Sequence, residues 1–262
     1  MRDPLDVARY IFVNDENELR SGWRVLIFVV VFAMSAALLT GLINGFAALF
    51  PSLAPAVQTE AERPTSRQFV FLGINNLINF LAAMIASGFC ARVLERRSLA
   101  SVGFKLHKRW PRDFTLGSLL GGSSLAIAVG IIASVGAVTF VVQNRNPGDL
   151  ARGLTISVLF FIIAGATEEL VFRGFPFQAF VHNLGGARAI AITSFLFGIA
   201  HITNPGATVF STLNTILAGV WLGIAYLMTR SLWLATALHW SWNFAMVFVF
   251  GFRSADSPRS IR

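Results

Sequence analysis

Charged residues are scarce in this chain. Asp, Glu, Lys and Arg together make up 13% of its 262 residues, and hydrophobic residues make up 55%. An average soluble domain has about 25% charged residues. The mean hydropathy is +0.66. This composition excludes an ordinary soluble globular protein, and the fold class we predict is an all-α, polytopic transmembrane helical bundle.

Cysteine is nearly absent as well. Cys90 is the single cysteine, which excludes an intramolecular disulfide and any metal site built from several cysteines. Acidic residues number 13 against 21 Lys and Arg, a net charge of +8. The positive charge falls in short loops and at the termini, where it sets topology and contacts anionic lipid. Membrane lipid is therefore an expected partner, and nucleic acid is not, because no segment outside the membrane is long enough to form a basic surface with stacking aromatics.

Long hydrophobic runs predict seven spans, within a range of six to eight. They are expected at about 25–49, 69–91, 114–142, 154–182, 187–202, 208–229 and 232–250. The first run is too long for the core of a signal peptide, so we expect it to be retained. Pro176 lies within the fourth predicted span, where a proline kinks a helix. Gly117 with Gly121 and Gly219 with Gly223 have the four-residue spacing of closely packed helices.

The loop at 92–113 is the most basic in the chain, and the positive-inside rule places it in the cytoplasm together with the N-terminus. Seven spans would then put the basic C-terminal tail outside, against the same rule. We expect an integral, multi-pass membrane protein, of the plasma (inner) membrane if the source is bacterial. Its predicted parts are two N-terminal spans with the basic loop (1–113), a third span with an outer turn (114–153), a catalytic core (154–252) and a tail (253–262).

Two adjacent carboxylates and an arginine interrupt the fourth apolar run, as Glu168, Glu169 and Arg173. A charge at the middle of a membrane costs at least about 2.5–3.5 kcal/mol, so three together indicate a function or a buried ion pair. Glu169 and Arg173 are four residues apart and can pair on one helix face. Glu168 lies about 100° away around the helix and is left free for chemistry.

Two of the four histidines also lie in apolar runs. His201 lies near the end of the fifth predicted span, and His239 shares a helix face with Asn243. Glu168 and His201 are each about 16 residues from the turn at Gly185, so an antiparallel hairpin would bring them to the same depth, about 25 Å in. His239 lies only about 12 Å from the turn at Arg230 and Ser231, so an offset between the hairpins is needed to bring it to the depth of Glu168. His107 and His182 are expected to be solvated surface residues.

These side chains suit two kinds of chemistry. A glutamate beside a histidine can deprotonate water for attack on an amide carbonyl, with a second histidine and an asparagine stabilising the oxyanion. Alternatively, Glu168, His201 and His239 could bind Zn²⁺ or another divalent metal with a position left open for water. The His-Glu-x-x-His metalloprotease motif is absent, so no familiar local motif decides between them.

The order of these motifs resembles that of the CPBP (CAAX protease and bacteriocin-processing, or Abi) family of intramembrane endopeptidases. That family has Glu-Glu-x-x-x-Arg, Phe-x-x-x-His and His-x-x-x-Asn motifs in this order. Here they are Glu168 to Arg173, Phe197 to His201 and His239 to Asn243. The ordered set of three is far more specific than any one motif, and it covers about 154–250. The segment Arg96 to Gly103 also looks like the loop that the family has before its next span.

The resemblance implies hydrolysis of a peptide or protein substrate within the membrane. Glu168 would be the base that activates water, helped by His201, and Glu169 with Arg173 would be the supporting pair. His239 and Asn243 would stabilise the oxyanion or bind metal, since both a metalloprotease and a metal-free glutamate mechanism have been argued for the family. A proton-coupled transporter and a catalytically inactive immunity or scaffold protein are the alternatives.

Overall fold

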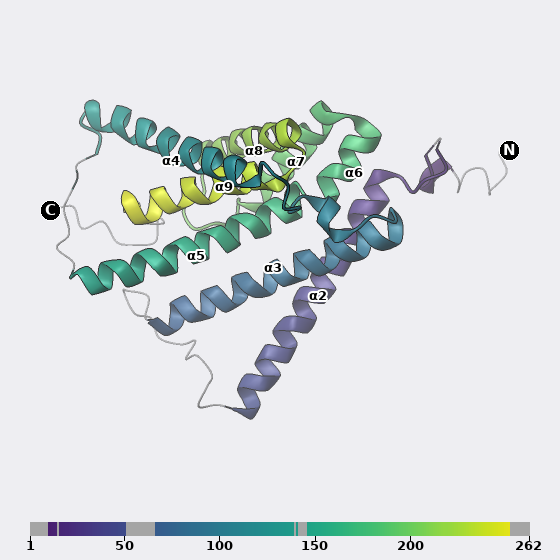
Figure 1. Ribbon diagram of the computed structural model, residues 1–262, viewed down its shortest axis with the longest axis horizontal. Coiled ribbons are helices and arrows are strands. Elements are labelled where there is room, and N and C mark those ends of the chain that lie inside the picture. The colour runs from purple at the N-terminus through teal and green to yellow at the C-terminus, as the bar shows by residue number, and fades with distance from the viewer. Residues whose placement is uncertain (1–9, 15, 51–65, 139, 141–145, 252–262) are drawn as a thin grey trace.

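The computed structural model describes residues 10–14, 16–50, 66–138, 140 and 146–251 (Figure 1). In these ranges the chain is helical and forms no β-strand, which confirms the predicted all-α fold. The α-helices are α2 Ser21–Leu49, α3 Ser66–Leu94, α4 Trp110–Ser134, α5 Pro147–Phe172, α6 Phe175–Leu184, α7 Gly186–Ala200, α8 Val209–Thr229 and α9 Leu232–Phe244. A 3-10 turn, η2 Leu99–Val102, precedes α4, and a π-helical turn, η3 Ala245–Val249, extends α9.

Six helical segments are long and apolar enough to cross a membrane. They are α2, α3, α4, α5 together with α6, α8, and α9 together with η3. The count lies within the predicted range of six to eight. The predicted span at 187–202 forms a helix, α7, but its 15 residues extend only about 22 Å, less than the roughly 30 Å core of a bilayer. The structure is that of a multi-pass membrane protein with one short helix packed against α8.

The helices form a single bundle in which α9 lies between α4 and α5 (Figure 1). α7 packs against α8, and α2 crosses α3 obliquely and contacts α6. The start of α2 and the last described turn lie at opposite ends of the bundle (Figure 1). The basic tail at 253–262 lies outside the described residues.

Helix α5 begins seven residues before the position expected from hydropathy. Asn146 caps it, because its side-chain oxygen accepts a hydrogen bond of 2.8 Å from the backbone N–H of Asp149. Pro147 occupies the first turn, where a missing N–H is tolerated. Helix α4 in turn ends at Ser134, well short of the predicted 142. Local capping therefore sets both boundaries where the apolar pattern alone cannot.

The predicted kink at Pro176 is wrong in its detail. The helix ends at Phe172 and a new helix, α6, begins at Phe175, so that Pro176 lies in the first turn of α6. The break falls at Arg173 and Gly174. A Cβ on residue 174 would overlap the carbonyl of Leu170, so only glycine fits there. The proline therefore starts a helix and does not bend one.

The paired glycines mark close helix packing, as predicted. A Cβ on Gly121 would overlap the carbonyl oxygen of Leu238 on α9, and Gly117 faces Leu234 in the same way. On α8, a Cβ at Gly219 would come within 2.9 Å of Ser194 on α7. The backbones of α4 and α9, and of α7 and α8, approach so closely that a methyl group does not fit between them.

We expect Gly121→Ala to lower stability, because the added methyl group must push α4 away from α9. Overpacking of this kind costs about 1–3 kcal/mol. Gly122→Ala is the matched control, since a Cβ there meets nothing within 4 Å, and alanine favours a helix by about 0.5–1 kcal/mol. Thermal melts of the purified protein in detergent measure both. Equal melting temperatures for the two variants would contradict this account of the α4–α9 contact.

Candidate active site

Three separate elements bring the predicted site residues together inside the bundle. Glu168 lies in the last turn of α5, His201 caps the end of α7, and His239 lies in the middle of α9. The Oε2 atom of Glu168 is 3.5 Å from Nε2 of His201 and 3.7 Å from Nε2 of His239. Two imidazoles from different helices therefore face one carboxylate oxygen. The predicted meeting of Glu168 and His201 is confirmed.

The neighbouring carboxylate, Glu169, is held on the opposite side. One of its oxygens, Oε1, accepts hydrogen bonds from Nη1 of Arg173 at 3.1 Å and from Nδ1 of His239 at 2.9 Å. The side chains of Glu169 and Arg173 are completely buried. Nη2 of Arg173 also donates to the backbone carbonyl of Gly219 on α8, at 3.1 Å. The predicted Glu169–Arg173 pair is present, and it joins α5 to both α8 and α9.

Phe197, in the last turn of α7, forms an apolar wall shared by the charged groups. The guanidinium carbon of Arg173 lies 4.5 Å from the centre of its ring, a cation–π contact. The imidazole rings of His201 and His239 lie 4.5 Å and 5.9 Å from the same ring centre. The first residue of the Phe-x-x-x-His motif thus orients the arginine and both histidines.

The hydrogen bonds of the two histidines fix which nitrogen can act as a base. Nδ1 of His201 donates to the carbonyl of Phe197 at 2.7 Å, because a carbonyl can only accept. Nδ1 of His239 donates to the Glu169 carboxylate in the same way. In both neutral rings the free electron pair is therefore on Nε2, the atom that faces Glu168. Oε2 of Glu168 and the Nε2 atoms of His201 and His239 are thus three acceptors that can hold a proton or a polarised water molecule between them.

The side chains of Glu168 and Glu169 differ in solvent exposure. The side chain of Glu168 is 33% exposed and that of His201 is 26% exposed, whereas Glu169 is fully buried. Oε2 of Glu168, the oxygen that faces the two imidazoles, is itself buried and has no hydrogen-bond partner within the described residues. Glu168 and His201 thus lie on the open side of the site, where a substrate can reach them.

The turn before α9, the helix that carries His239, packs against the segment at Gly103. The backbone N–H of Leu232 and the hydroxyl of Ser231 both donate to the carbonyl of Gly103, at 2.9 and 3.1 Å. Leu232 is completely buried beneath this segment. The turn before α9 is therefore covered by the segment at Gly103, whereas the turn at Gly185 is exposed.

Asn243 is the one predicted site residue that the structure does not join to the others. It lies one turn beyond His239 on the same face of α9 and is half-buried. No contact of its side chain with Glu168, His201 or His239 is present among the described residues. Sequence reasoning in turn missed the carbonyl of Gly219 as an acceptor for Arg173. The Gly219–Gly223 pattern signalled only the close approach of α8 that makes this contact possible.

The residues predicted to bind zinc have suitable chemistry but unsuitable spacing. Two ligands of one zinc ion at about 2.0–2.2 Å can be at most about 4.4 Å apart. The donor atoms of Glu168, His201 and His239 do not all lie within 4.8 Å of one another, a spacing that among the described residues only Glu16, Glu18 and His182 meet. The three residues as arranged do not enclose a metal ion, and the predicted ligand set requires one imidazole to move.

We expect Glu169→Gln to destabilise the protein and Glu168→Gln to leave it folded. Replacing Glu169 leaves Arg173 as a buried charge without its counterion and weakens the bond to His239, at a cost of about 3–5 kcal/mol. The side chain of Glu168 is partly exposed, and its Oε2 has no hydrogen-bond partner among the described residues. Thermal melts in detergent compare the two. A lower melting temperature for Glu168→Gln than for Glu169→Gln would show that the two carboxylates are assigned in reverse.

Comparison with known protein families gives a match in the part of the chain that contains these site residues. Residues 151–245 match the model of the family described as type II CAAX prenyl endopeptidase Rce1-like. The matched segment overlaps the predicted core at 154–252, and the division of the chain into four parts stays a prediction. Neither curated proteins nor solved structures give a significant match. Residues 151–245, which contain Glu168, Glu169, Arg173, His201 and His239, are an Rce1-like domain of the CPBP family.

Proposed function

We propose that this protein is an intramembrane endopeptidase of the CAAX type in which Glu168 and His201 activate water. The match to the Rce1-like family supports protease activity. The observation that carries the catalytic assignment is the convergence of two imidazole Nε2 atoms on one oxygen of a partly exposed carboxylate inside the membrane. A peptide with its carbonyl at the open side of the site would meet this carboxylate first.

In the proposed reaction, the ionised Glu168 accepts a proton from a water molecule, whose oxygen attacks the carbonyl carbon of the scissile bond. His201 faces Glu168 with Nε2 and shares that proton. Its Nδ1 stays bonded to the Phe197 carbonyl, so the ring keeps its orientation while the proton moves. The proton is then delivered to the leaving amine. This sequence uses one carboxylate and one imidazole in turn as base and acid.

His239 is proposed to stabilise the oxyanion, with Asn243 as a second donor. Glu169 accepts from Nδ1 of His239, so only the protonated ring carries a hydrogen on Nε2 that can be donated. The negative charge of Glu169 favours that protonated form. Removing one such donor typically slows the reaction by about 10²–10³-fold. The half-buried position of Asn243 on the same face of α9 supports its role as the outer donor.

We expect Glu168→Gln to abolish cleavage, and His201→Gln to reduce it by about 10²–10⁴-fold, the usual contribution of a general acid or base. The assay is hydrolysis of quenched-fluorescent peptides, with and without a prenylated C-terminal cysteine, by the purified protein in detergent. Asp149→Asn is the matched control, because it removes an exposed carboxylate from the first turn of the same helix. Full activity of folded Glu168→Gln would refute the assignment. Proton-coupled uptake into liposomes without any cleavage would indicate a transporter.

Metal dependence requires its own measurement. Because the three donor atoms are too widely spaced for zinc, we expect chelators to leave cleavage unchanged. We also expect the active enzyme to contain far less than one metal ion per chain at this site. Elemental analysis of wild type and His239→Ala tests this directly. Loss of activity on chelation, restored by Zn²⁺ but not in His239→Ala, would instead establish the zinc set of Glu168, His201 and His239.

A further inference from the structure

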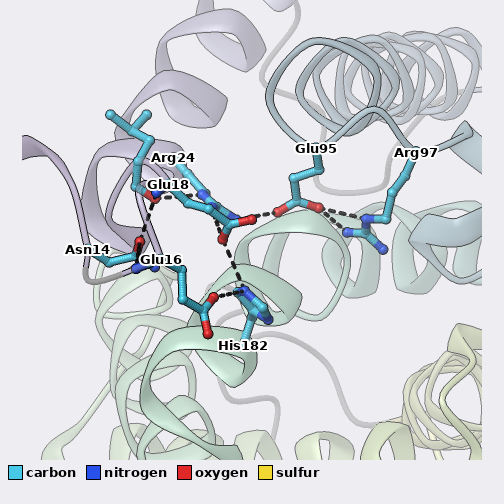
Figure 2. A network of polar contacts seen from close by, with 8 residues as sticks. Asn14, Glu16, Glu18, Arg24, Glu95, Arg97 and His182 are labelled. Carbon is cyan, nitrogen blue, oxygen red and sulfur yellow. Dashed lines mark hydrogen bonds and ion pairs between the residues drawn. The ribbon is translucent and has the colours of Figure 1, made fainter.

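A second cluster of charged residues lies at the end of the bundle where α2 begins (Figure 2). Glu16 and Glu18 belong to the segment before α2, and His182 lies in the last turn of α6, more than 160 residues later. Nε2 of His182 is 3.1 Å from Oε2 of Glu18 and 3.4 Å from Oε2 of Glu16. This cluster shares no residue with the proposed active site and plays no part in the mechanism above.

The spacing of these three atoms is that of metal ligands. Neighbouring ligands of a tetrahedral zinc ion, at about 2.0–2.1 Å from the metal, are about 3.3 Å apart. The two distances from His182 lie on either side of this value, and all three donor atoms are within 4.8 Å of one another. The three donor atoms lie close enough for small side-chain movements to bring all of them to one ion.

The local charge also favours a cation. Arg24 is buried between Glu18 and Glu95, at 2.7 and 3.0 Å. Arg97 pairs with the other oxygen of Glu95 (Figure 2). With Glu16 included, the cluster contains three carboxylates and two guanidinium groups, and a third guanidinium group, that of Arg20, belongs to a residue lining the adjacent cavity. Nε2 of His182 has a single hydrogen to offer to two carboxylate oxygens, whereas a divalent ion can contact both oxygens and the ring.

A cavity beside the cluster provides room for the remaining ligands. Its volume is about 670 Å³, and Glu16, Arg20, His182 and Asn183 are among the residues that line it. The side-chain oxygen of Asn183 is buried and has no hydrogen-bond partner among the described residues. The guanidinium group of Arg20 is held by Tyr10, since its Nε donates to the carbonyl of Tyr10 and its guanidinium carbon lies over the Tyr10 ring. An unpartnered amide oxygen and space for water are what a three-ligand site needs to complete its coordination.

We propose that Glu16, Glu18 and His182 form a binding site for a divalent metal of the zinc type. Two carboxylates and one imidazole suit Zn²⁺ or Co²⁺ better than Mg²⁺, which prefers oxygen ligands alone. A bound ion would connect the segment before α2 to the end of α6, and α6 belongs to the residues that match the Rce1-like family. Its role is to join the N-terminal helices to the Rce1-like domain, and it takes no part in hydrolysis.

Zn²⁺ binding to the full-length protein in detergent tests the proposal. All variants carry Glu168→Gln, so that the active-site carboxylate contributes no ligand. We expect equilibrium dialysis with elemental analysis to find about one more Zn²⁺ per chain in this parent than in Glu16→Gln or His182→Gln. We expect affinity in those variants to be at least about tenfold weaker. Both changes are at exposed side chains, so melts without metal should match the parent.

His107→Gln is the matched control, since His107 is the other histidine outside the proposed active site and faces one carboxylate, Asp113, at 3.6 Å. It should bind Zn²⁺ and gain thermal stability from it like the parent. Equal binding by parent and His182→Gln would overturn the proposal, as would an equal loss in His107→Gln, which would indicate general binding to surface histidines. Stabilisation by acid alone, without Zn²⁺ binding, would overturn it in favour of a proton on His182.

Discussion

One oxygen of Glu169 is the point on which the arrangement of the site depends. It accepts from Arg173 on its own helix and from His239 on α9, in surroundings from which water is excluded. A buried carboxylate can remain ionised only with such partners, and each partner is costly to bury without it. The three groups therefore fix one another. Their mutual requirement aligns α5, α8 and α9, since Arg173 also bonds to the carbonyl of Gly219.

This arrangement gives the two adjacent carboxylates different roles through their surroundings alone. Glu169 has both a cation and an imidazole bonded to one oxygen, so its charge is already compensated. Glu168 meets only the Nε2 atoms of His201 and His239, at distances longer than a good hydrogen bond. A buried carboxylate oxygen without a hydrogen-bond partner among the described residues favours any group that brings hydrogen atoms, and a water molecule brings two. The geometry thus binds the nucleophile of the proposed hydrolysis at the carboxylate that is free to deprotonate it.

Sequence alone predicted the contacts that follow from helix geometry. The Glu169–Arg173 pair requires only a spacing of four residues, and the meeting of Glu168 with His201 requires only equal distances from Gly185. The position of His239 was not predictable in this way, because it depends on how deeply the turn at Ser231 is buried beneath Gly103. The cluster of Glu16, Glu18 and His182 was missed for the same reason. A pattern within one segment carries no information on a contact across more than 160 residues.

The break between α5 and α6 lets the chain run from the proposed active site to the N-terminal half. Gly174 allows the helix to end directly after Arg173, and Pro176 starts α6 in a new direction. α6 then reaches the N-terminal half, where Gln178 donates to the carbonyl of Val102 at 2.6 Å and accepts from Arg97 at 3.0 Å. Side chains of α2, α3 and η2 pack with those of α6 in the largest buried apolar cluster.

The N-terminal half also contacts helix α5, because Asn76 on α3 donates to the carbonyl of Phe160. An amide in a transmembrane helix often links two helices in this way. The Rce1-like segment therefore does not complete its own core. The helices that precede it supply apolar packing to α6, a hydrogen bond to α5, and the segment over the start of α9 that sets the depth of His239. Since the distance from His239 to Glu168 depends on that depth, the N-terminal half contributes to the geometry of the site without supplying a catalytic group.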